Sequence, residues 1–309
     1  MINNIDINET EVLKRYPDVL EMLLKDHTTQ RNIYWATDSY ADRGEGYQFN
    51  DAITIASITG ENGMVIRPRS IKSREEQTKR SKDMAEVFTP SWVCNAQNNL
   101  VDEAWFGRKD VFNVASSDHT WSAVRERITF PEGKTWKDYV RDTRLEITCG
   151  EAPYLASRYD TVSGLPIELT ERIGLLDRKL RVVSENTETT GDFLKWCQEA
   201  YRNTYGYEWQ GDNLLLARES LLFTFIDYYM AKFNKEPLLK SIQYIAYIVS
   251  WNIWQMDGLK FCPPGEEPVE QQLQLDIFEE PQQSNLCLIR DWRMPRDRQK
   301  ITFKSLLKQ

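Results

Sequence analysis

The stretch LEITCGEAPYL, Leu145 to Leu155, contains the order of features that decides the fold. An apolar, strand-like run comes first, a turn of Cys, Gly, Glu and Ala follows, and Pro153 then opens a helix-like segment. Strands that alternate with helices are typical of a parallel α/β sheet, in which ligands bind beyond the carboxyl ends of the strands. The turn from Cys149 to Ala152 is therefore a candidate ligand-binding turn. An ordinary tight connection between a strand and a helix is the alternative.

Helical spacing of apolar residues predicts several helices around this turn. The first covers residues 9–25 with an interruption at Pro17, and another starts where Thr89 caps a helix whose first position is Pro90. Asp192 is the expected cap of a later helix. Further helices are expected over 171–186, 191–206, 213–233 and 238–259, the last of which ends at Asp257-Gly258.

Strands are predicted by β-branched and apolar runs. Residues 51–68 are expected to form a hairpin around Gly60 to Gly63, residues 205–209 a short strand, and NLCLIRDW (285–292) a buried strand. Residues 107–142 show no clear period and are expected to be a loop region, and 261–284 an acidic linker.

Composition indicates a soluble globular chain with a large core, since 41% of its 309 residues are hydrophobic. No apolar run is long enough to cross a bilayer and no signal peptide is evident, so a cytoplasmic location without membrane contact is expected. The five cysteines are scattered and no C-x-x-C pair occurs, which argues against a disulfide framework and a zinc site, and no metal is predicted.

The net charge of −8 argues against a protein that coats nucleic acid nonspecifically. Two stretches are nevertheless basic, and either could contact phosphates, although a solvated surface is the simpler interpretation. The first contains Arg67, Arg69, Lys72, Arg74, Lys79, Arg80 and Lys82, and the second contains Arg290, Arg293, Arg296, Arg298, Lys300, Lys304 and Lys308.

LEITCGEAPYL resembles the S-adenosylmethionine (AdoMet) binding motif of the amino-group DNA methyltransferases, L-E-P-x-C-G-x-G-x-F-L. Ala152 stands in place of the second glycine of that motif. Upstream, AEVFTP (85–90) is similar to the G-x-x-[FY]-T-P motif of the adenine-specific members, whose aromatic and threonine touch the methionine part of AdoMet. Downstream, YGYEWQGDN is similar to the motif in which an acidic residue, here Glu208, holds the ribose. NIWQMDGL is similar to N-I-x-x-G-D-x-L, which would place Asp257 near the adenine.

This resemblance implies a Rossmann-like α/β methyltransferase sheet with helices on both faces, plus a small N-terminal extension. It divides the chain into a helix and hairpin extension with the basic stretch (1–84), an AdoMet-binding core (85–259), and a linker, late strand and basic tail (260–309). The cofactor-binding residues that it implies are Phe88, Thr89, Pro90, Glu146, Thr148, Cys149, Gly150, Ala152, Glu208, Trp209 and Asp257.

The sequence departs from the family at the catalytic motif, [DNS]-P-P-[YFW], which is absent. Asp291 and Trp292 are the preferred equivalents, an acceptor followed by an aromatic after an apolar run; a surface Asp-Trp pair is the alternative. In the family, the acceptor orients the target amine and the aromatic ring stacks on a flipped base. Little chain follows Trp292, so DNA specificity is expected from the N-terminal segment, the basic stretches or another subunit.

Three functions are compatible with these residues. The first is an AdoMet-dependent adenine methyltransferase, or modification-subunit-like protein, of a restriction-modification or phage-defence system, with DNA and a restriction or specificity subunit as partners. The second is a catalytically degenerate relative that serves as a binding or regulatory subunit. The third, a metal-dependent nuclease, rests on Asp142 and Glu146 and lacks the lysine that usually follows such acids.

Overall fold

A three-stranded parallel sheet lies at the centre of the protein, whose computed structural model describes residues 5–269 and 284–308. Its strands are β3 (Arg144–Glu146), β4 (Thr204–Glu208) and β5 (Ile253–Gln255), in the order β3-β4-β5. Glu146 pairs with Gly206, and Glu208 pairs with Gln255. The middle strand β4 is paired on both sides, whereas β3 has a neighbour on one side only among the described residues.

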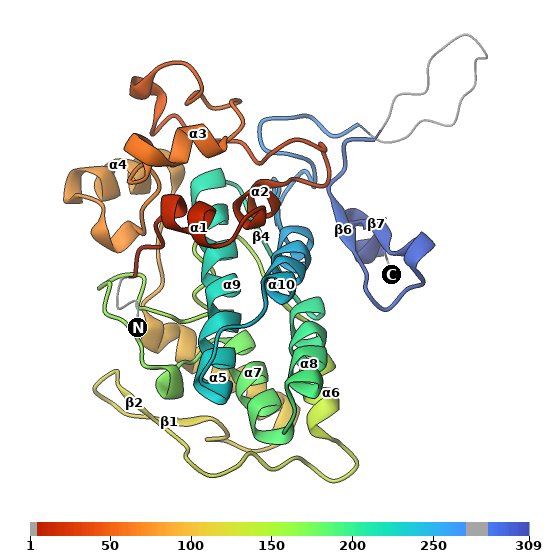
Figure 1. Cartoon of the computed structure of the whole chain (residues 1–309). Coiled ribbons are helices and arrows are strands. Elements are labelled where there is room, and N and C mark those ends of the chain that lie inside the picture. Colours follow the sequence, from red (N-terminus) through yellow and green to blue (C-terminus); the bar gives the residue numbers. More distant parts are fainter. Residues whose placement is uncertain (1–4, 270–283, 309) are drawn as a thin grey trace.

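Long helices surround this sheet (Figure 1). Helix α9 is buried over most of its length, because nearly every turn carries Leu, Phe or Ala, and it packs against both β4 and β5. Helix α10 also contacts both strands. The helices that follow the basic stretch are α5 (Ser91–Phe106), α6 (Trp136–Arg141), α7 (Leu175–Asn186), α8 (Thr190–Arg202), α9 (Gly211–Phe233) and α10 (Leu239–Asn252).

The N-terminal part of the chain joins the same core. Val12 and Leu20 are buried in one cluster with Leu221 of α9. The predicted interruption at Pro17 is present, because one helix ends at Arg15 and the next begins at Val19. The elements here are α1 (Glu9–Arg15), α2 (Val19–Leu24), η1 (Ala41–Arg43), α3 (Ile55–Ile58), η2 (Gly60–Asn62), η3 (Arg69–Ile71) and α4 (Arg74–Met84).

The hairpin predicted over residues 51–68 is wrong. Thr54 and Ser57 form a capping box, in which each side chain bonds the other's backbone N–H, and this box starts the short helix α3. Ile53 and Ile58 are both buried, although neither lies in a strand. The alternating apolar residues of this segment are therefore buried without forming a hairpin.

Two predicted helix starts also differ. Helix α5 begins at Ser91 with Pro90 as its N-cap, and the Thr89 side chain does not cap it. The amide of Ser91 instead donates to the Asp160 carboxylate at 2.7 Å. In α8 the N-cap is Thr189, whose hydroxyl accepts from the Asp192 amide, so Asp192 lies inside the helix.

Two further segments differ from the sequence predictions. Part of the expected loop over 107–142 is ordered as β1 (Asn113–Ala115), β2 (Trp121–Ala123) and α6. Helix α10 ends at Asn252, whose side-chain amide donates to the carbonyls of Tyr201 and Thr204, and the chain then continues as β5. The helix predicted to reach Asp257 is therefore too long.

The late strand lies outside the parallel sheet. It is β6 (Leu288–Arg290), which pairs in antiparallel fashion with β7 (Lys300–Thr302). Ile289 packs with Tyr207 and Trp254 in a separate hydrophobic cluster. The short 3-10 helices η4 (Leu169–Glu171), η5 (Arg296–Arg298) and η6 (Phe303–Lys308) complete the described elements.

The fold is therefore mixed α/β and mostly helical, with small sheets that include one parallel sheet of three strands. Within residues 5–269 and 284–308, no helix is long and apolar enough to span a membrane.

Candidate functional site

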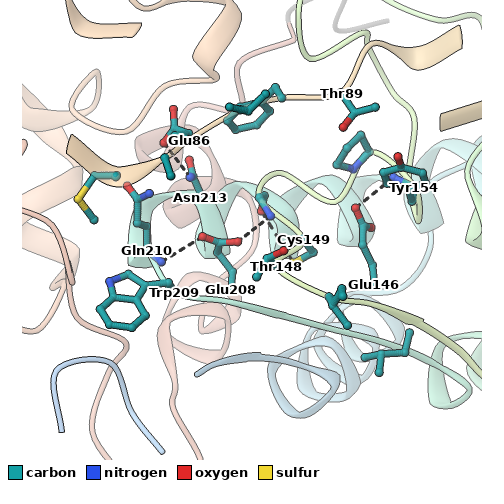
Figure 2. Close-up of a pocket in the computed structure, with 18 of the residues that line it drawn as sticks. Glu86, Thr89, Glu146, Thr148, Cys149, Tyr154, Glu208, Trp209, Gln210 and Asn213 are labelled. Atoms are coloured by element: carbon teal, nitrogen blue, oxygen red, sulfur yellow. Dashed lines mark hydrogen bonds between the residues drawn. The ribbon is translucent and has the colours of Figure 1, made fainter. Parts of the chain in front are cut away.

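A cavity of about 1000 Å³ opens at the carboxyl ends of β3 and β4. Figure 2 shows the segment with Glu86 and Thr89 on one side, and the turn after β3 with Glu208 on the other. The segment and the turn are about sixty residues apart in sequence. The place agrees with the rule that ligands of parallel sheets bind beyond the carboxyl strand ends.

The turn after β3 has an unusual backbone. Thr148, Gly150 and Ala152 have φ values of 45°, 53° and 60°, so all three adopt the left-handed conformation. This conformation costs about 1–2 kcal/mol for a residue with a side chain, and a β-branched threonine there is rare. The surroundings hold the turn in place, since the amide of Cys149 donates to the Tyr207 carbonyl at 2.8 Å. Strain of this kind concentrates at ligand-binding sites.

Glu208 ends β4 beside this turn. One carboxylate oxygen accepts from the Gly150 amide at 2.8 Å and the other from the Gln210 amide at 3.2 Å. Each oxygen retains a lone pair for a further donor. Burial raises the pKa of Glu208 to about 7, although these two amides favour the ionised form.

Glu146 stabilises the segment that follows the turn. Its two oxygens accept from the amides of Tyr154 and Leu155 at 3.4 and 3.2 Å, so the carboxylate fixes the backbone that follows the turn. Burial raises its pKa well above the ordinary value. Glu146 lines the cavity, and its bonding shows a role in shaping the turn.

Phe88 and Thr89 cover the turn from the opposite side. A Cβ added to Gly150 would lie 3.4 Å from the Phe88 ring, so the ring packs directly on the glycine. The carbonyl of Thr89 accepts from the Thr161 hydroxyl at 3.2 Å, which helps to hold this segment. The two motifs predicted from sequence thus meet across one cavity.

A buried ion-pair network, which the sequence did not predict, holds the covering segment, residues 86–89, in place. Glu86 lies 2.6 Å from Arg80 and accepts from the side-chain amide of Asn213 at 3.0 Å. Arg80 also pairs with Asp212 at 2.9 Å, and Lys72 lies 3.3 Å from the same carboxylate. Burial opposes ionisation of Asp212, but Arg80 and Lys72 lower its pKa below the ordinary value. The available signal was the proximity of Glu86 and Asp212 to the two motifs.

The predicted cofactor-binding residues divide into two groups. Pro90 and Ala152 flank the cavity without lining it, and Asp257 lies apart, where its carboxylate accepts from the amides of Leu259 and Lys260. The predicted residues that line the cavity are Phe88, Thr89, Glu146, Thr148, Cys149, Gly150, Glu208 and Trp209.

The predicted catalytic pair is not at this cavity. Asp291 accepts two hydrogen bonds from the Arg293 guanidinium, both at 2.9 Å, and Trp292 donates its indole N–H to Asn252 at 2.8 Å. Both follow β6, which belongs to the antiparallel hairpin. The assignment assumed that this apolar run was a central parallel strand, so its physical basis is wrong.

Two apolar side chains that line the cavity are open to solvent. Val87 is 82% exposed and Ile147, which follows β3 directly, is 62% exposed.

The described part of the chain contains no cluster of three or more His, Cys, Asp or Glu side chains placed to hold a metal ion. Comparison with protein-family models, with curated proteins and with solved structures found no match to this chain.

Proposed function

We propose that the cavity binds AdoMet and that the protein is a methyltransferase-like component acting on adenine amino groups in DNA. One observation supports this most strongly. Phe88 and Glu208, which were predicted from separate motifs, both contact Gly150 in the strained turn. The strand order β3-β4-β5 is also the order of one half of a doubly wound Rossmann-like sheet.

The lining residues suit the parts of AdoMet. Glu208 has free lone pairs that two adjacent ribose hydroxyls can approach, as acidic residues do in dinucleotide folds. Trp209 is fixed by its indole N–H, which donates to the Ala36 carbonyl at 3.0 Å, and offers a flat apolar surface to the adenine. Phe88 and Thr89 would hold the methionine end. The volume is at the upper end of the range for small-molecule sites.

The chemistry that AdoMet supplies when bound is an electrophilic methyl group on a sulfonium. The protein has to hold a nucleophilic amine in line with it and accept the proton that the amine loses. Among the described residues that line the cavity, no Asp or Asn is followed by two prolines and an aromatic. We therefore propose that a partner subunit delivers the amine acceptor, at the open mouth beside β3.

The second candidate is a protein that keeps the cofactor cavity and has lost transfer. The distance of Asp291 and Trp292 from the cavity favours it.

Equilibrium dialysis with tritiated AdoMet, competed by S-adenosylhomocysteine, ATP and NAD, tests the cofactor class. Competition by S-adenosylhomocysteine and none by ATP or NAD is expected. Transfer of the tritiated methyl to unmethylated DNA would then support the first function, and binding without transfer in the presence of partner extract would support the second. Equal competition by ATP or NAD would contradict both.

A further inference from the structure

The two basic stretches of the chain differ in their ion pairs and in their exposure to solvent. In the first, Arg67 pairs with Glu76 at 3.0 Å, Arg69 lies 3.6 Å from Glu86, and Lys72 is buried against Asp212. Each of these three cations therefore has an acidic partner within the protein, and contact of this stretch with phosphates stays a prediction. Helix α4 presents exposed cations there together with exposed acids.

The second stretch forms the β6–β7 hairpin, whose charge contrasts with the rest of the molecule. Residues 284–308 contain seven Lys or Arg and two Asp, a net charge of +5 in a chain of net charge −8. Both acids face arginines within the hairpin: Asp291 is bonded to Arg293, and Asp297 lies 3.8 Å from Arg298. Arg296 makes no ion pair among the described residues and is exposed. A segregated positive module on an acidic protein is typical of contact with a polyanion.

The base of the hairpin is packed against the parallel sheet. Ile289 and Phe303 are buried with Tyr207 and Trp254, which ties the hairpin to the parallel sheet. Arg290 lies over the Trp292 ring at 4.5 Å and donates to Gln299 at 2.7 Å. Such cation–π and hydrogen-bond contacts fix the orientation of the strands.

The tip of the hairpin, by contrast, is open to solvent. Residues 293–298, RMPRDR, are all exposed, and Figure 1 shows the hairpin at the margin of the helical body. A two-stranded antiparallel ribbon is one of the shapes that the major groove of duplex DNA admits, and guanidinium groups bond phosphates in a fork. Shape and charge therefore agree on the same partner.

We propose that the β6–β7 hairpin, through Arg296, Arg298 and their neighbours, binds the phosphate backbone of duplex DNA. The inference deepens the proposed function, because it names the surface that would bring the substrate to the protein. The hairpin does not line the cavity, so it acts in docking and takes no part in methyl transfer.

Fluorescence anisotropy with a labelled DNA duplex and the full chain tests the proposal. Arg296→Glu with Arg298→Glu should weaken binding about tenfold or more at low salt, and should reduce the slope of log affinity against log salt by about 2. The matched control is Arg74→Glu with Lys79→Glu on α4, which changes the net charge equally and should retain nearly all of the affinity.

Undiminished binding by the hairpin variant, equal losses in both variants, or no binding by the unaltered protein would each overturn the proposal. Failure of the cofactor proposal gives a different pattern. Glu208→Ala should abolish AdoMet binding and leave DNA binding unchanged, whereas the hairpin variant should show the reverse.

Discussion

Glu208 gives the cavity a pH dependence. Its pKa is about 7 in the free protein because the carboxyl is buried, and the ionised form is the better acceptor for ribose hydroxyls. A ligand that donates to the carboxylate favours ionisation. The affinity for AdoMet should therefore rise as the pH increases through about 7 and then level off.

Isothermal titration from pH 5.5 to 8.5 measures this effect. AdoMet itself titrates, so the profile of Glu208→Gln, which cannot ionise, is the reference. The ratio of the two affinities should rise with pH. A constant ratio would show that Glu208 does not bind the ligand in its charged form.

Glu9 makes stability depend on pH. Glu9 is 1% exposed, neither of its carboxyl oxygens has a hydrogen-bond partner among the described residues, and burial, with the nearby Asp6 charge, raises its pKa from 4.5 to about 8. The folded state thus retains a proton that the unfolded chain releases above pH 4.5. This contribution is complete below pH 4.5 and is lost as the pH rises toward 8.

Urea unfolding of the unaltered protein and of Glu9→Gln over this range provides the check. The free energy of unfolding of the unaltered protein should fall relative to the variant between pH 4.5 and 8. Glu219, whose pKa burial and Glu9 also raise, remains in both proteins. Parallel curves would contradict the assignment.

The proximity of Gly150, Phe88 and Glu208 was predictable from the sequence motifs, and the three residues do meet. The network of Arg80, Glu86 and Asp212 was not, because a charged residue in a helix carries no sign that it is buried. The burial of Arg80 is evident only from its contact with Asp212, which lies more than 120 residues away in the sequence.

At the scale of elements, the start of α9 depends on a close approach. A Cβ on Gly211 would lie 2.1 Å from the Tyr34 carbonyl oxygen, and the Gly211 amide donates to Trp35 at 3.0 Å. Gly211→Ala should therefore lower the free energy of unfolding by about 1–3 kcal/mol or more, since the backbone must shift.

Gly191→Ala near the start of α8 is the matched control. An added Cβ there meets only the Thr189 hydroxyl at 3.9 Å, and alanine favours the helix, so stability should stay equal or rise by up to about 1 kcal/mol. Chemical denaturation of both variants decides the matter. Equal stabilities would show that α9 is not pressed against the N-terminal segment.

The longer helices were predictable where apolar residues recur at helical spacing, as in α7 and α8. Short strands were not. Ile253–Gln255 continues the apolar pattern of α10, so composition alone gives no boundary. The strand begins where the Asn252 amide bonds two carbonyls of distant segments, and such long-range contacts cannot be seen in a local pattern.

At the scale of the whole molecule, one core joins the N-terminal helices to α9 and α10, so ligand binding should stabilise all of it together. With AdoMet at 100 times its dissociation constant, the free energy of unfolding should increase by about 2.7 kcal/mol. Differential scanning fluorimetry with and without AdoMet measures the shift. Two separate transitions, with only one shifted, would contradict a shared core.

The parallel sheet was predictable from the alternation of strands and helices, but its extent was not. The apolar run before Asp291 fits a central parallel strand as well as it fits an antiparallel hairpin. The position of β6 depends on packing of Ile289 against Tyr207 and Trp254, and the order of residues in the sequence does not reveal this packing. For this reason the strand before Asp291 was wrongly predicted to belong to the parallel sheet.

We propose above all that the cavity between Phe88 and Glu208 holds AdoMet. Calorimetric titration at pH 8 tests it most directly, with Glu208→Ala as the site variant and the exposed Glu188→Ala as the control for loss of one carboxylate. We predict one AdoMet per chain for the unaltered protein and the control, and at least a tenfold loss of affinity for Glu208→Ala. Binding by Glu208→Ala as tight as in the unaltered protein, or no binding by any of the three, would contradict the claim.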